Sequence, residues 1–244
     1  MVHHAADEGY GRGAARYARA RPPYHPDILD EAAALTGGGL TVELGAGTGI
    51  ATAELAASGV RLVAVEPVAA MRAELTRASP GVDVREGTAE AIPFGDGSVD
   101  TVVVAQAFHW FDAPAALDEI ARVLIAGGRL VLLWNVAEDL PWVQECSTVI
   151  DRHAGSAPRR RTMRWRDAID VDERYVLQLE RSVANPWEVG PDEVVDRFLS
   201  TSFIAALPDA EQSDIGSELR RVVAPLGARF DFPYRSELQA WTVG

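Results

Sequence analysis

The chain has 244 residues, of which 48% are hydrophobic, so it can bury the core of one α/β domain with insertions. Its formal net charge of −13 disfavours nucleic acid as a partner, because a polyanion is bound mainly through a basic surface. All 23 residues counted as Lys or Arg are arginine, and the lack of lysine excludes Schiff-base chemistry with pyridoxal phosphate and phosphate binding by a Walker-A lysine.

Strand-like and helix-like segments alternate between residues 26 and 135. Prolines, glycines and the spacing of apolar residues mark where each segment begins and ends. In chain order, we expect a helix at 26–35, a strand at 40–44, a glycine-rich turn at 45–49, a helix at 50–57, a strand at 61–65, a helix ending at 78, strands at 82–85 and 101–106, a helix at 113–124 and a strand at 129–134. This alternation predicts an α/β fold with a doubly wound, Rossmann-like sheet and helices on both faces.

The alternation stops after residue 135. The later segments expected are a helix at 142–153, a strand at 175–183, helices at 191–202 and 209–223, and a strand region at 229–242. We therefore expect an N-terminal helical cap (1–36), a ligand-binding core (37–135), an inserted lid segment (136–170) and a C-terminal segment (171–244) that completes the sheet. Arginines crowd residues 152–166; they could recruit a carboxylate or phosphate, although such a run more often forms a solvated or ion-paired face.

The central functional feature is the turn Gly45-Ala46-Gly47-Thr48-Gly49 between a strand and a helix. Glycines let a ligand approach the backbone closely, and a helix N-terminus favours negative charge. The spacing departs from the dinucleotide pattern G-x-G-x-x-G/A, because Ile50 stands where a small residue is needed. Nicotinamide and flavin cofactors are therefore disfavoured. Glu66 ends the next strand, where an acid can accept hydrogen bonds from ribose hydroxyls.

Four stretches together carry a family resemblance: VELGAGTGIAT at 42–52, AVEP at 64–67, REGTAEAIPFGDGSVD at 85–100 and AQAFHWFD at 105–112. With them, the chain resembles the class I S-adenosylmethionine-dependent methyltransferases, and among these the small-molecule branch (type 11 domain) that includes trans-aconitate methyltransferase. The resemblance extends to residues 17–24 and 200–211. It implies a mostly parallel sheet with an antiparallel C-terminal strand, S-adenosyl-L-methionine as cofactor, and methyl transfer to a small-molecule acceptor.

The resemblance also implies a set of cofactor-binding residues. They are Tyr17, Arg21, Glu43, Gly45, Ala46, Gly47, Gly49, Glu66, Pro67, Met71, Thr88, Ala89, Gln106 and Ala107. In this set, Glu43 is expected near the cofactor's amino group, Glu66 on its ribose and Arg21 near its carboxylate. The family usually has Asp where this chain has Thr88, which removes a charge-assisted contact to the adenine amine.

The transferred methyl is expected to move by in-line displacement, which depends mainly on alignment and desolvation. A protonated acceptor also needs a base, and His109 follows the fourth strand directly and has a suitable reference pKa. His109 is therefore the candidate catalytic residue, with a structural role as the alternative. The aromatic candidates for acceptor binding are Tyr24, Trp110, Trp134 and Trp142, although core packing is the commoner role for any single tryptophan.

The sequence also bears on partners and compartment. The one cysteine, Cys146, cannot form an intrachain disulfide, and residues 1–21 lack the apolar segment of a secretory signal, which together favour the cytoplasm. No apolar stretch is long enough to span a membrane, and the scattered histidines predict no metal site. We expect a monomer or a homodimer that methylates an O, N or C atom, with secondary metabolism as one setting; a cofactor-binding enzyme or partner subunit that transfers no methyl group is the alternative.

Overall fold

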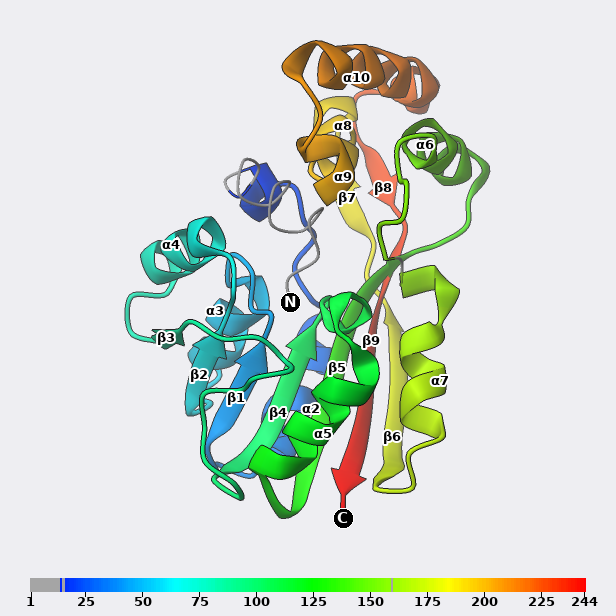
Figure 1. The fold of residues 1–244 in the computed structure, drawn as a ribbon. Helices are drawn as coiled ribbons and strands as arrows, with labels where there is room; N and C mark the ends of the chain where they lie inside the picture. The colour runs from blue at the N-terminus through cyan, green and yellow to red at the C-terminus, as the bar shows by residue number, and fades with distance from the viewer. Residues whose placement is uncertain (1–13, 15, 159) are drawn as a thin grey trace.

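The computed structural model describes residue 14, residues 16–158 and residues 160–244. Seven strands form one sheet in the order β3-β2-β1-β4-β5-β9-β6 (Figure 1). They are β1 (Thr41–Leu44), β2 (Leu62–Val65), β3 (Asp83–Arg85), β4 (Val99–Ala105), β5 (Leu124–Ala137), β6 (Tyr175–Ala184) and β9 (Tyr234–Val243). The first five pair in parallel, while β9 runs antiparallel to β5 and β6. The predicted α/β class and its antiparallel C-terminal strand are thus confirmed.

Helices cover both faces of this sheet, which explains why every residue of β1 and β2 is buried, without alternation between a buried and an exposed face. Val102 and Val104 of β4 pack with α5 (Ala113–Val123) and α7 (Arg164–Asp170) on one face. Val103, between them, packs with α2 (Pro26–Leu35) and α3 (Ile50–Ala57) on the other. Helix α4 (Ala69–Ala78) contributes Leu75 to a small cluster with residues of β2 and β3.

A second hydrophobic core forms a cap beyond the sheet. We call cap cluster the set of elements that share it: α6 (Pro141–Asp151), α8 (Pro191–Leu199), α9 (Ser202–Ala205), α10 (Asp209–Val223), β7 (Trp187–Val189) and β8 (Phe230–Phe232). Figure 1 shows these helices above the end of the sheet at which the arrow of β4 points. The cap cluster therefore overhangs the carboxyl ends of the parallel strands, the edge at which open α/β sheets bind their ligands.

The structure divides the chain differently from the predicted parts. Helix α2 packs on the sheet and does not belong to a cap, while residues 16–19 are helical and residues 1–13 and 15 lie outside the described residues. The expected lid at 136–170 is split, because α6 joins the cap cluster and α7 buries Trp165 and Ile169 on the sheet. Much of the expected sheet-completing segment also belongs to the cap cluster. Apolar spacing identifies the buried face of a helix but not its partner.

The C-terminal strand region also differs from the prediction, here because of a proline. The predicted strand at 229–242 is two strands, β8 and β9, separated by Pro233, which has no N–H to donate to a ladder. The predicted helix at 191–202 is shorter in the structure, where α8 ends at Leu199 and a separate helix, α9, begins at Ser202. Strand β7 and helix α7 were not predicted. None of the helices in the described part of the chain combines the length and hydrophobicity needed to cross a membrane.

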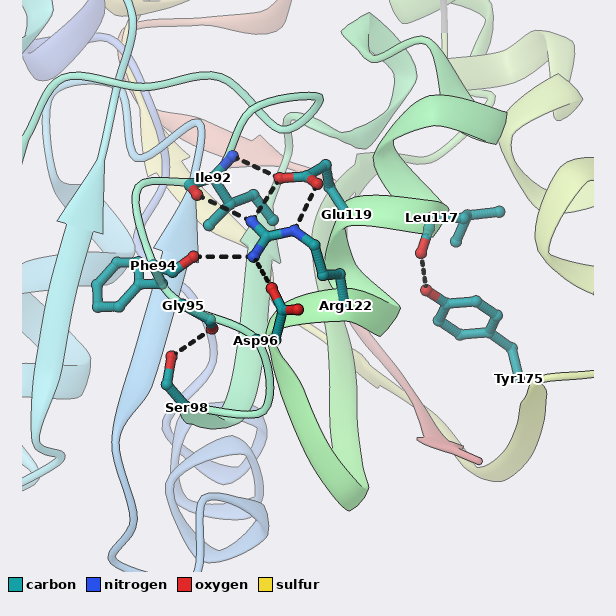
Figure 2. Close-up of polar contacts among 9 residues, drawn as sticks. All are labelled: Ile92, Phe94, Gly95, Asp96, Ser98, Leu117, Glu119, Arg122 and Tyr175. Atoms are coloured by element: carbon teal, nitrogen blue, oxygen red, sulfur yellow. Dashed lines mark hydrogen bonds and ion pairs between the residues drawn. The ribbon is translucent and has the colours of Figure 1, made fainter.

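The loop between β3 and β4 is fastened to α5 by Arg122 (Figure 2). The Arg122 guanidinium donates to the carbonyl oxygens of Phe94 at 3.0 Å and Ile92 at 3.3 Å, and it pairs with Glu119 at 2.7 Å. Glu119 in turn accepts a hydrogen bond from the backbone N–H of Ile92 at 3.0 Å. Because this loop begins after β3 and contains Thr88 and Ala89, the network fixes one margin of the expected cofactor site.

Candidate active site

The turn between β1 and α3 contains three glycines with left-handed backbone: φ is +64° at Gly45, +59° at Gly47 and +84° at Gly49. A Cβ on Gly45 would lie 2.7 Å from the Cβ of Ala107, and one on Gly49 would lie 2.8 Å from the Cγ of Leu75. A Cβ on Gly47 would meet no atom within 4 Å. Gly45 and Gly49 therefore allow the protein to pack, while Gly47 leaves room for a ligand beside the backbone.

This division of roles predicts different losses from two matched substitutions. Gly49→Ala is expected to lower the free energy of unfolding by about 2–4 kcal/mol, because it adds steric overlap with Leu75 to an unfavourable left-handed conformation. Gly47→Ala adds only the conformational cost, about 1–2 kcal/mol. Urea denaturation of the two variants measures both values. Equal losses would show that Leu75 does not restrict Gly49.

Glu66 follows β2 and holds the glycine turn in place. Its Oε2 accepts a hydrogen bond from the Gly47 N–H at 2.8 Å, and its Oε1 accepts one from the Val68 N–H at 2.8 Å. Burial raises the pKa of Glu66, although these two backbone donors and the charge of Arg72 act in the opposite direction. Each carboxylate oxygen has two acceptor sites, so Glu66 retains capacity for hydroxyl groups of a ligand.

Glu43 lies in β1, one residue before the strand ends at Leu44. The carboxyl is buried, and the Thr52 hydroxyl of α3 donates to its Oε2 at 2.6 Å. Burial raises the pKa of Glu43 to about 8, against the lowering effect of the Thr52 hydrogen bond. At neutral pH the carboxyl is therefore mostly protonated, and a cationic group placed beside it would favour its ionised form.

A cavity with an empty volume of about 570 Å³, including its opening to solvent, lies over the turn. It brings together half of the residues predicted to bind the cofactor: Tyr17, Arg21, Glu43, Gly45, Ala46, Gly47 and Gln106. Tyr24, predicted on the acceptor side, lines this first cavity instead. The predicted residues outside its lining are Gly49, Glu66, Pro67, Met71, Thr88, Ala89 and Ala107.

Two of the residues outside the lining are placed in packing positions. Met71 is buried in a small cluster with Val68, and Ala89 is buried in the main core. Thr88 forms an isolated antiparallel bridge with Ala91. The expected contact of Met71, Thr88 and Ala89 with adenine stays a prediction, because proximity to a strand end does not determine which way a side chain points.

The residue that directly follows strand β4 is strained. Gln106 has a φ of +61°, which is uncommon for a residue other than glycine. Its backbone N–H donates to the Leu133 carbonyl at 2.9 Å, and its side-chain Nε2 donates to the Asn135 carbonyl at 3.1 Å, so β5 holds it in this conformation. Strain of this kind is concentrated at functional sites.

A second cavity lies between the strand ends and the cap cluster, with an empty volume of about 1150 Å³ including its opening. The residues that line both cavities are Tyr17, Arg21, Gln106, Asn135, Arg197 and Tyr234. Asn135 also fixes the segment before α2, because its Nδ2 donates to the carbonyl oxygens of Pro22 and Pro23 at 3.1 and 3.0 Å. Two ligands could therefore meet where the cavities adjoin.

The predicted aromatic residues differ in where they lie. His109 and Trp110 line the second cavity, with their ring centroids 5.2 Å apart. Trp134 is fully buried behind them, its ring 5.8 Å from that of His109, and Trp142 packs in the cap cluster 4.9 Å from Phe232. Neither is among the residues that line the two cavities, so for Trp134 and Trp142 the structure favours the core role over the predicted acceptor contact.

The arginine-rich stretch also separates into two kinds of residue. Arg152 pairs with Glu218 at 3.1 Å and Arg166 with Asp170 at 2.8 Å, as expected for an ion-paired face. Arg160 also forms an ion pair, with Glu237, but in addition it lines the second cavity. Sequence reasoning missed Asn135, Tyr234 and Arg197 altogether. No local motif marks them, since they are brought to the site from β5, β9 and α8 only by tertiary packing.

Residues 42–132 match the family described as Methyltransferase domain. An uncharacterised methyltransferase of Mycobacterium tuberculosis is 35% identical over 219 residues, which cover 88% of this chain and 85% of that relative. The chain belongs to the class I methyltransferases. A second methyltransferase relative, from Schizosaccharomyces pombe, is 40% identical over 216 residues and covers 86% of this chain and 84% of its own length.

The fold of this methyltransferase is shared with solved structures of low sequence identity. A methyltransferase structure from Anaeromyxobacter dehalogenans superposes with a TM-score of 0.65 at 21% identity, covering 90% of this chain and 97% of that one. The predicted family and enzyme class are thus confirmed, whereas the trans-aconitate methyltransferase-like branch stays a prediction.

Proposed function

We propose that this methyltransferase transfers the methyl group of S-adenosylmethionine to a small-molecule acceptor. The observation that carries the proposal is the junction of the two cavities at the strained Gln106. One cavity lies over a glycine turn beside two buried carboxyls, and the other lies beneath the cap cluster. A cofactor in the first and an acceptor in the second would meet at the end of β4.

The residues that line the first cavity, together with Glu66 beside it, fit the cofactor. Gly47 leaves open space beside the turn, and Glu43 is a buried acid whose ionised form a cofactor ammonium would favour. Arg21 lines the same cavity and can receive a carboxylate, while Glu66, bonded to the turn, can accept from ribose hydroxyls. When bound, S-adenosylmethionine supplies an electrophilic methyl group on a sulfonium.

The chain's own residues would align the acceptor and keep water out. The cap cluster covers the strand ends, and Asn135 holds the segment at Pro22 and Pro23 beside the site. His109, packed against Trp110 and facing the second cavity, is placed to take a proton from an acceptor that carries one. Alignment and exclusion of water then supply most of the rate enhancement.

Calorimetric titration with S-adenosylmethionine and, separately, with NADH tests the proposal. We expect micromolar binding of the first and no binding of the second. Binding of NADH alone would return the glycine turn to the dinucleotide-binding class. A screen of small acceptors, read out as formation of S-adenosylhomocysteine, then tests transfer; cofactor binding without any product across the screen would support the non-transferring alternative.

His109→Ala separates a catalytic from a structural histidine once an acceptor is known. If His109 is the base, turnover is expected to fall by roughly tenfold or more, while the affinity for the cofactor is retained. Steady-state rates and calorimetric titration with S-adenosylhomocysteine measure the two quantities. Unchanged turnover would leave His109 with the packing role alone.

A further inference from the structure

The second cavity carries more information about the acceptor. We propose that the acceptor is a small anion with an apolar body, and that Arg197, assisted by Arg160 and Ser202, binds its carboxylate or phosphate group. This inference rests on the proposed function, because it names the class of molecule that occupies the acceptor side of that site.

Arg197 is the main observation. It lies on α8, is half-buried, and lines both cavities. Its Nε donates to the Tyr234 hydroxyl at 2.8 Å, which fixes the plane of the guanidinium. Among the residues that the structure describes, no carboxylate pairs with Arg197, so the four N–H donors on its two terminal nitrogens remain available. A planar fork of this kind matches the two oxygens of a carboxylate or phosphate.

Two further polar atoms at the second cavity are buried without a hydrogen-bond partner among the described residues. Ser202, which is 1% exposed and lines the second cavity, has a buried Oγ without a hydrogen-bond partner in the described part of the chain. Arg160 pairs with Glu237 through Nη2 at 2.5 Å, but its buried Nε also lacks a partner among the described residues. Buried donors left unbonded are costly, so a ligand oxygen that satisfies them would be favoured.

The charge and polarity of the cavity lining indicate which class of acceptor it binds. Arginines outnumber acids among the described residues that line the second cavity, and Asp151 is the acid among them, although the chain as a whole carries −13. The rest of the wall mixes polar side chains with apolar ones, among them Val143, Ile150 and Phe203. A cationic spot beside apolar side chains favours a small amphipathic anion, whereas the negative net charge of the chain disfavours a polyanion.

Three probes with the same chain test the proposal on protein saturated with S-adenosylhomocysteine: octanoate, octyl phosphate and octan-1-ol. We expect at least one anion to bind roughly tenfold or more tightly than the alcohol. Arg197→Met is expected to remove that preference while leaving octanol affinity unchanged, and Arg197→Lys is expected to retain part of it. Arg152→Met, in an exposed pair with Glu218, is the matched control and should behave as the wild type.

The outcomes separate this inference from the proposed function. Equal binding of anions and alcohol, anion affinities weaker than about 10 mM, or an unchanged preference in Arg197→Met would each overturn the inference. So would a variant that loses S-adenosylhomocysteine affinity but keeps the anion preference, since Arg197 would then serve the cofactor carboxylate. If the wild type fails to bind S-adenosylhomocysteine, the proposed function fails, and titration of the same probes without it still tests Arg197.

Discussion

Replacing Glu66 with alanine is expected to weaken the binding of S-adenosylhomocysteine by roughly a hundredfold or more. Two ribose hydroxyls that donate to one carboxylate form charge-assisted hydrogen bonds, each of about 1.5–3 kcal/mol. The substitution also removes the acceptor for the Gly47 N–H, which holds the turn beside the cofactor. The expected loss therefore combines a direct contact with the order of the turn.

Calorimetry at constant pH measures the effect of Glu66→Ala. Glu86→Gln is the matched control, because Glu86 also follows a strand of the sheet but is 77% exposed and pairs only with Arg72 at the surface among the described residues. It should bind S-adenosylhomocysteine as the wild type does. An affinity of Glu66→Ala within about threefold of the wild type would show that this carboxylate does not hold the ribose.

The sequence predicted the helices best where their ends carry local signals. Helices α2, α3 and α10 begin and end at the predicted residues, because prolines, glycines and apolar spacing act within a few positions of each end. The break at Pro233 could also have been predicted from the sequence, since proline cannot donate a hydrogen bond to a β-ladder. The prediction of one strand at 229–242 did not take this proline into account, and the structure has two strands, β8 and β9. These outcomes depend on local chemistry.

The division between sheet and cap could not be predicted in the same way. Helix α7 and the helices of the cap cluster all have apolar faces, and nothing in their periodicity states whether a face meets the sheet or another helix. Trp134 and Trp142 illustrate the same limit, because a large apolar side chain near a strand end can serve a core as well as a pocket. Tertiary packing decides these cases.

For this reason, the cofactor side of the site could be predicted from the sequence better than the acceptor side. The cofactor side centres on one continuous motif and the strand ends that follow it, so Glu43, Gly47 and Gln106 were identified from sequence and lie together in the structure. The acceptor side is assembled from α6, α8, α9 and the stretch around Arg160, which are distant along the chain. Arg197 carries no local signature, and only the fold brings it to the junction of the cavities.

The buried acid at the bottom of the cofactor side makes stability and binding depend on pH in opposite ways. Burial raises the pKa of Glu43 to about 8, from an ordinary value near 4.5, so the folded unliganded protein keeps a proton that the unfolded chain releases. The contribution of this group to stability is fully present below pH 4.5 and is lost as the pH rises toward 8. Glu43→Gln should flatten that part of the stability profile.

Binding should show the reverse dependence. A cofactor ammonium beside Glu43 favours the carboxylate, so binding at pH 7 is expected to release roughly 0.5–1 proton, and affinity should rise by up to about tenfold per pH unit between pH 5.5 and 7. Calorimetric titration with S-adenosylhomocysteine in buffers of different ionisation enthalpy counts the protons. Glu43→Gln should abolish both effects, whereas Glu54→Gln, which removes another glutamate of raised pKa outside the lining of both cavities, should retain them. Proton release that persists in Glu43→Gln would assign the ammonium to a different carboxyl, because the amide introduced by this substitution has no proton to give up.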